Sequence, residues 1–469
     1  MNTLYRSLIG SLLVSAGLTN LPCAAQTAAK PSQGARPAVA QAQHLPIAFF
    51  VDAIGDDEAK ALAAVSRIGK DWRDSSAAML IEMIHRVPSR RVLASVIALV
   101  EKASGRPFDG SLDPWYEWLW SAERPVHPDY AHFKALLYTR IDARFDEYFE
   151  GRPQAIIRLD EIRWGGVRRD GIPPLKNPKM VGAREARWLG DDDVVFGVAI
   201  NGDIRAYPKR ILAWHEMFKD RIGGRELAGV YCTLCGALVL YDVTFKGVQH
   251  ELGTSGFLYR SNKLMYDHAT KSMWSTLTGT PVVGPLVGRG IELESLYVVT
   301  TTWKEWRRRH PETLVLSLDT GHQRDYSEGA AYREYFSSDR LMFGVPKIDA
   351  RLPNKAEVLA LRLPRVAGES LAIAADFLAS RPVYQDRIAD VNFVVLTDAS
   401  GANRVYEAGG VTFVNWDKVS MVSDSNGRRW KMDEDALSAS TGETLKRLPA
   451  HRAFWFGWNA AFPATRLVK

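Results

Sequence analysis

A Cys-x-x-Cys-Gly motif at residues 232–236 constrains the fold of this chain more than any other sequence feature. The residues on either side, 227–231 and 237–242, are apolar, β-branched and aromatic, which is typical of β-strands. Gly236 permits a tight turn between them because glycine adopts positive φ at little cost. The motif therefore predicts a strand, a turn that carries both cysteines, and a second strand.

Three uses of the cysteine pair stay open. A disulfide across so short a loop adds little loop-closure entropy, and a redox dithiol usually lies at a helix N-terminus, whereas here a strand follows. A metal site would take two thiolates from Cys232 and Cys235 and a third ligand from His215, seventeen residues before Cys232. Soft sulfur ligands favour copper or zinc, and Met265 could add a thioether. We favour the metal site, with a thiol–disulfide redox protein or a structural disulfide as alternatives.

The first 25 residues predict a signal peptide that directs export. Arg6 precedes an apolar stretch, 8–18, that is too short to span a bilayer, and Ala25 is a plausible cleavage position. A lipid-anchored alternative uses Cys23, but Pro22 fits that reading badly. Removal of the signal leaves two of the three cysteines, which an oxidising compartment would normally join unless a metal keeps them reduced. We expect a periplasmic or secreted protein with no transmembrane segment.

At 469 residues the chain is too long for one ordinary core, so several domains are expected. Residues 26–44 read as a flexible linker, and 45–150 show helical periodicity, for example at Leu62, Val65 and Ile68. This segment resembles short HEAT-like helical hairpins and could be a docking surface for a protein partner. The net charge of +6 is dispersed along the chain, which argues against a nucleic-acid partner.

The chain becomes β-rich from about residue 155, and this region contains a repeated pattern. Trp-x-x-Trp followed by Pro and Thr occurs at 303–313 and again 152 positions later at 455–465. In the same comparison Cys232 corresponds to Thr397 and Cys235 to Ser400, so the second copy lacks the thiols. We predict an α+β fold: a mainly β region of two similar halves, 155–345 and 346–469, preceded by the all-α HEAT-like segment.

Longer motifs carry a resemblance to a known family. They are Trp-His-Glu at 214–216, Tyr-Cys-x-x-Cys-Gly at 231–236, Ser-Gly-x-Leu-Tyr-x-Ser-Asn-x-Leu-Met-Tyr-Asp at 255–267, and Trp-x-x-Trp before His-Pro-Glu-Thr at 303–313. Over about residues 156–469 the chain resembles the bacterial and archaeal family called domain of unknown function thirty-one seventy-nine. The family name implies no established activity. The helical segment lies outside the resemblance, so we expect a chain that begins near Ile156 to fold without it.

The third of these motifs supplies candidate pocket residues. Together they could form one polar pocket wall: Ser255, Arg260, Met265, Tyr266 and Asp267. Asp267 could instead cap a turn. Motifs for a phosphate-binding loop, a serine-hydrolase elbow and a zincin helix are absent from the sequence, so we expect no nucleotide cofactor. Two classes stay open: an exported metalloenzyme, and a non-enzymatic protein that holds a metal or small ligand for a partner.

Overall fold

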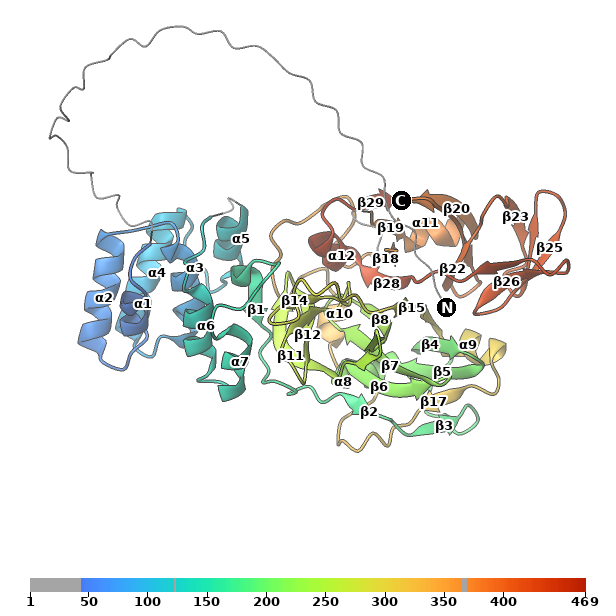
Figure 1. Ribbon diagram of the computed structural model, residues 1–469, viewed down its shortest axis with the longest axis horizontal. Helices are drawn as coiled ribbons and strands as arrows, with labels where there is room; N and C mark the ends of the chain where they lie inside the picture. The colour runs from blue at the N-terminus through green and yellow to red at the C-terminus, as the bar shows by residue number, and fades with distance from the viewer. Residues whose placement is uncertain (1–43, 122–123, 364–368) are drawn as a thin grey trace, which may run out of the picture. The chain divides into compact units, whose positions relative to one another are not determined.

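The computed structural model describes residues 44–121, 124–363 and 369–469, and the chain passes from helices into β sheets (Figure 1). The predicted signal peptide, Cys23 and nearly all of the predicted linker lie outside the described residues. The α+β class is confirmed, with helices first and mainly β structure after them. No helix of the described chain combines the length and the apolar composition that a bilayer span requires.

The helical segment begins and ends its helices at recognisable caps. The Asp57 side chain accepts a hydrogen bond from Lys60 N at the start of α2, and the Ser89 hydroxyl accepts one from Val92 N at the start of α4. Gly105, with φ 66°, ends α4. The helices are α1 (Ile47–Ala53), α2 (Glu58–Lys70), α3 (Ser76–Met83), α4 (Arg90–Ser104), α5 (Asp113–Ser121), α6 (Tyr130–Tyr138) and α7 (Asp146–Phe149).

The helices share a core with the β sheet that contains Ile162 and Phe257. Lys134 Nζ donates to Glu82 Oε1 at 2.7 Å and to the carbonyl of Ile162 at 2.6 Å. The Tyr138 ring lies edge-on to Phe257, with centroids 5.2 Å apart. A single apolar cluster runs from the helices to these strands. The shared core argues against our expectation that a chain beginning near Ile156 folds alone.

Three five-stranded sheets form most of the β structure before residue 320. The first has the order β16-β4-β5-β17-β3, with β3 (Met180–Gly182), β4 (Val194–Ile200), β5 (Asp203–Pro208), β16 (Val299–Thr302) and β17 (Leu314–Leu316). The second has the order β15-β8-β7-β6-β2, with β2 (Leu175–Lys176), β6 (Met217–Ile222), β7 (Arg225–Cys232), β8 (Ala237–Asp242) and β15 (Ser295–Leu296). The third has the order β1-β11-β12-β13-β14, with β1 (Ile162–Trp164), β11 (Leu252–Tyr259), β12 (Asn262–Asp267), β13 (Met273–Ser275) and β14 (Pro281–Val283).

Shorter elements connect these sheets. They are α8 (Lys209–His215), the hairpin β9 (Thr244–Phe245) and β10 (Val248–Gln249), α9 (Trp303–Arg309) and α10 (Arg333–Phe336). An Asn-Gly turn joins β4 to β5, with positive φ at both Asn201 and Gly202.

The later part of the chain contains three further sheets. One has the order β28-β18-β19-β29, with β18 (Glu357–Leu361), β19 (Leu371–Ala374), β28 (His451–Phe454) and β29 (Arg466–Val468). Another has the order β20-β21-β22, with β20 (Val383–Ile388), β21 (Val391–Thr397) and β22 (Asn403–Glu407). A meander contains β23 (Phe413–Trp416), β24 (Met421–Asp424), β25 (Arg429–Met432), β26 (Ala436–Ala439) and β27 (Thr444–Lys446). The helices here are α11 (Ala375–Ser380) and α12 (Trp455–Ala461).

Two sets of strands have the same order and the same directions. In β16-β4-β5-β17 the first two pairs are antiparallel and the last is parallel, and β28-β18-β19-β29 repeats this pattern. The antiparallel sets β6-β7-β8 and β20-β21-β22 also correspond. The Trp306 indole donates to Thr313 Oγ1 at 3.0 Å, and the Trp458 indole donates to Thr465 Oγ1 at 3.0 Å.

Candidate functional site

The Cys-x-x-Cys motif forms the turn between β7 and β8, as the sequence predicts. Cys232 is the last residue of β7 and pairs with Ala237, and Cys235 N donates to Cys232 O at 3.2 Å. Gly236 has φ 62°, and a Cβ there would lie 2.9 Å from the Phe454 ring. The two cysteines form a disulfide, with their Cα atoms 5.3 Å apart.

The disulfide is buried and is packed against neighbouring elements. Cys232 is 2% exposed and Cys235 is 1% exposed. The backbone N–H of Phe454 donates to Cys235 O at 2.7 Å, and the Tyr335 hydroxyl donates to Leu234 O at 2.8 Å. These contacts hold the turn against β28 and α10, so a partner molecule reaches the sulfurs only after a local rearrangement.

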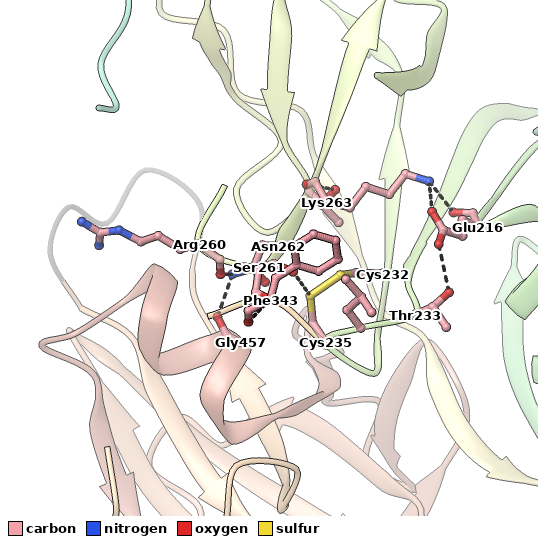
Figure 2. Close-up of a disulfide and its surroundings, with 12 residues drawn as sticks. Glu216, Cys232, Thr233, Cys235, Arg260, Ser261, Asn262, Lys263, Phe343 and Gly457 are labelled. Carbon is pink, nitrogen blue, oxygen red and sulfur yellow. Dashed lines mark hydrogen bonds and ion pairs between the residues drawn. A yellow bond between two sulfur atoms is a disulfide. The ribbon is translucent and has the colours of Figure 1, made fainter. Parts of the chain in front are cut away.

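A buried ion pair lies beside the turn (Figure 2). Lys263 Nζ donates to Glu216 Oε2 at 2.9 Å, and the Thr233 hydroxyl, between the cysteines, donates to Glu216 Oε1 at 3.3 Å. The Lys263 and Glu216 side chains are only 5% and 12% exposed. Burial lowers the pKa of Lys263, and the Glu216 carboxylate opposes that shift.

A small cavity borders the ion pair and the turn. Its volume is about 80 Å³, and its walls include Glu216, Lys263 and Leu234. Because a water molecule occupies roughly 30 Å³, two waters fit there.

His215 is held by partners other than the cysteines. Its Nδ1 lies 2.9 Å from the Pro173 carbonyl, and its Nε2 lies 2.6 Å from the Tyr326 hydroxyl. Since a carbonyl only accepts, Nδ1 carries the proton, and neutral Nε2 accepts from Tyr326. Thr320 then donates to the Tyr326 oxygen at 2.6 Å. Burial lowers the pKa of His215, which favours this neutral form.

Strand alternation separates His215 from the thiols. Side chains of β7 alternate between two apolar clusters: Cys232 belongs to one, and Tyr231 belongs to the other together with Tyr326. Within residues 44–121, 124–363 and 369–469, no three His, Cys, Asp or Glu side chains are grouped so that they could hold a metal ion. The site of Cys232, Cys235 and His215 for copper or zinc stays a prediction.

The other candidate pocket residues each have a separate contact. The Ser255 hydroxyl donates to Leu264 O at 2.6 Å, Met265 is fully buried, and the Arg260 guanidinium pairs with the Glu161 carboxylate. These contacts account for all three side chains as parts of the fold.

Tyr266 and Asp267 also have partners of their own. The Tyr266 hydroxyl donates to Asp170 at 2.5 Å. Asp267 lies 2.8 Å from His250 Nδ1, and its other oxygen accepts from the backbone N–H groups of Ala269 and Thr270. The turn-capping alternative for Asp267 is therefore what the structure contains.

Sequence reasoning did not single out Glu216 and Lys263 as site residues. Both lie inside motifs that were recognised, Glu216 in Trp-His-Glu and Lys263 in the 255–267 motif. They are 47 positions apart, so no local spacing indicates that they pair.

Comparison with known families places these residues in one region. A family model described as "Protein of unknown function (DUF3179)" matches residues 169–465. The chain belongs to this family. The DUF3179 region includes His215, the cysteine turn and Lys263, whereas helices α1–α7 precede it. Comparisons with curated proteins and with solved structures find no match.

Proposed function

We propose that this chain is a thiol–disulfide protein, in which Cys232 and Cys235 alternate between a disulfide and a dithiol. The observation that carries the proposal is the buried Glu216–Lys263 pair on the cysteine turn. Burying two charges is expensive. The corresponding turn between β21 and β22 also has a buried ion pair: its Asp398 carboxylate accepts from the turn backbone and pairs with Arg404. The pair at the cysteine turn differs because its cation is a lysine, whose ammonium can give up a proton, whereas an arginine stays protonated.

The ion pair suits the chemistry of exchange with an external dithiol. A donor thiolate attacks one sulfur, the bond between the cysteines breaks, and the other sulfur leaves as a thiolate. The second donor thiol then displaces the mixed disulfide, so the donor loses two electrons and the cysteines gain them. The two protons that the donor releases end on the cysteines. The Lys263 ammonium can give a proton to the leaving thiolate because burial has lowered its pKa, and waters in the adjacent cavity can restore it.

Thiol trapping under native conditions tests this proposal. The full-length chain is incubated with dithiothreitol, alkylated with iodoacetamide and mapped by peptide mass spectrometry. We expect both Cys232 and Cys235 to be labelled while the circular dichroism spectrum is unchanged, and a disulfide oxidant to reverse the labelling. Labelling that occurs only after denaturant is added would show that the disulfide is an inert staple.

Metal binding by the reduced pair is a second proposal. Two cysteines with Cα atoms 5.3 Å apart can direct both thiolates at one ion. His215 would have to release the Tyr326 hydroxyl to become a third ligand. One equivalent of zinc or copper(I) bound per reduced chain, and lost in Cys232→Ser, would support this function. If the fully reduced chain binds neither metal, the proposed metal-binding function is wrong.

We also propose that the two β halves arose by internal duplication. The matching strand orders and the two tryptophan–threonine hydrogen bonds support this origin. In this account only the first half has the thiols, and the second half is structural. A solved structure in which the two sets fail to superimpose would contradict the duplication.

Export and a HEAT-like docking segment complete the proposed function. The disulfide supports an oxidising, periplasmic or secreted location. Packing of α2 against α4 supports the helical-hairpin reading of the first segment. Mass spectrometry of the mature protein should give an N-terminus near Gln26 without a lipid, and a diacylated Cys23 would contradict this.

A further inference from the structure

A cavity lies between the two sets of strands that share an order. Its volume is about 160 Å³. Its walls come from β4 and β16 of the earlier set and from β18 and β28 of the later set, together with both corresponding hairpin turns. Residues far apart in the sequence therefore meet around one cavity that opens to solvent.

Lys209 is the unbalanced charge of this cavity. In the described part of the chain, no acceptor lies within hydrogen-bonding distance of its Nζ and no carboxylate lies within 4.0 Å. Its ammonium instead lies 4.1 Å from the centre of the Phe336 ring. Burial lowers the pKa of Lys209, and the more distant carboxylates of Glu357 and Glu328 oppose the shift. Lys209 is partly exposed, so its ammonium can take an anion from solvent as its counter-ion.

The other charges of the cavity neutralise one another. Arg452 Nη1 donates to Glu357 Oε2 at 2.8 Å, and its Nε and Nη2 donate to Asn403 Oδ1 and Gly401 O, each at 2.7 Å. The arginine is thus fixed by three acceptors, and Glu357 is matched by it. One positive charge, that of Lys209, remains for a ligand.

We propose that this cavity binds a small monocarboxylate with an apolar body, whose carboxylate pairs with Lys209 and whose body lies against Phe196 and Phe454. Both rings line the cavity. The Thr301 hydroxyl lines it too and can donate to the second carboxylate oxygen. It lies 3.2 Å from Ser400 Oγ, whose own proton is donated to Asp398. An apolar cavity of about 150 Å³ accommodates one benzene ring, so benzoate is of a suitable size. The cavity borders the cysteine turn at Gly236, but neither cysteine lines it, so the oxidised chain is the form to test.

Calorimetric titration of the oxidised, full-length chain tests the site. Sodium benzoate is the probe, and benzamide, which has nearly the same shape without the charge, is its neutral control. We expect benzoate to bind at one site per chain and benzamide to bind at least about tenfold more weakly. Lys209→Met should weaken benzoate binding by roughly 10- to 100-fold, because a hydrogen bond between charged groups is lost. Lys209→Arg should retain binding.

Two controls keep the test decisive. Lys446→Met removes a lysine whose side chain is exposed on β27, and it should leave benzoate binding unchanged. Chemical acetylation of the wild-type chain requires no variant: benzoate should slow modification of Lys209 and leave that of Lys446 unaffected. The proposal is overturned if benzoate does not bind, if benzamide binds equally well, or if benzoate gives Lys209 no protection.

Discussion

Replacing Lys263 by methionine should destabilise the protein strongly at neutral pH. The change leaves the Glu216 carboxylate without the ammonium that lies 2.9 Å away, at a position where only 12% of the glutamate side chain reaches solvent. Breaking a buried pair by removing one partner costs about 3–5 kcal/mol. The double variant Glu216→Gln with Lys263→Met removes both charges, so it should recover at least about 2 kcal/mol of that loss.

Urea unfolding of the oxidised chains at pH 7, followed by tryptophan fluorescence, measures these differences. A Lys263→Met variant within about 0.5 kcal/mol of wild type would refute the reasoning, because surface substitutions lie in that range. A double variant as unstable as the single one would refute it too, since the loss would then come from packing and not from an unpaired charge.

The redox proposal adds a second consequence for the same variant. Loss of a nearby ammonium should raise the pKa of the cysteine thiol that leaves during reduction by about one unit and make the disulfide harder to reduce by roughly 30 mV. Lys134→Met is the matched control, because it breaks another buried lysine–glutamate pair, with Glu82, inside the helical segment. It should lower stability and leave the thiol pKa and the potential unchanged. Equal shifts in both variants would mean that the effect is not specific to the turn.

Three further predictions follow from burial. A chain that begins at Ile156 should be recovered unfolded or aggregated, because it exposes Phe257 and the rest of the shared core; a soluble, monomeric product with native fluorescence would contradict this. Burial lowers the pKa of His451 from 6.5 to about 4, so between these pH values the unfolded chain binds a proton at this histidine and the folded chain does not. The urea concentration at the unfolding midpoint should therefore fall as pH decreases from about 6.5 towards 4. The variant His451→Phe should reduce that pH dependence. Benzoate affinity should fall as pH rises, with a midpoint below the usual lysine value of 10.5, because burial lowers the pKa of Lys209 and only its ammonium pairs with a carboxylate.

The local structure around the cysteines could be predicted from the sequence. Apolar, β-branched residues before Cys232 and after Gly236 specify strands, and a glycine with φ 62° specifies the turn. Each copy of the Trp-x-x-Trp pattern forms the start of a seven-residue helix, α9 or α12. These features depend on neighbours in the sequence, which is why a pattern can indicate them.

The contacts that define the site could not be predicted in this way. The His215 imidazole is hydrogen-bonded to the hydroxyl of Tyr326, which lies 111 positions later in the sequence. This contact forms because α8 places the imidazole on the opposite side of the sheet from the thiols. The cavity around Lys209 depends on how β16 and β28 face each other, and its wall at Arg452 lies far along the chain. Such pairings are set by sheet packing, and a single sequence does not encode them in any spacing.

The equilibrium reduction potential of the Cys232–Cys235 pair tests the central claim most directly. The full-length chain is equilibrated in mixtures of reduced and oxidised dithiothreitol or glutathione, quenched with an alkylating agent and quantified by peptide mass spectrometry. The account predicts a two-electron transition between about −270 and −120 mV, the range of proteins that exchange disulfides. A potential below about −300 mV, typical of structural disulfides, would contradict it.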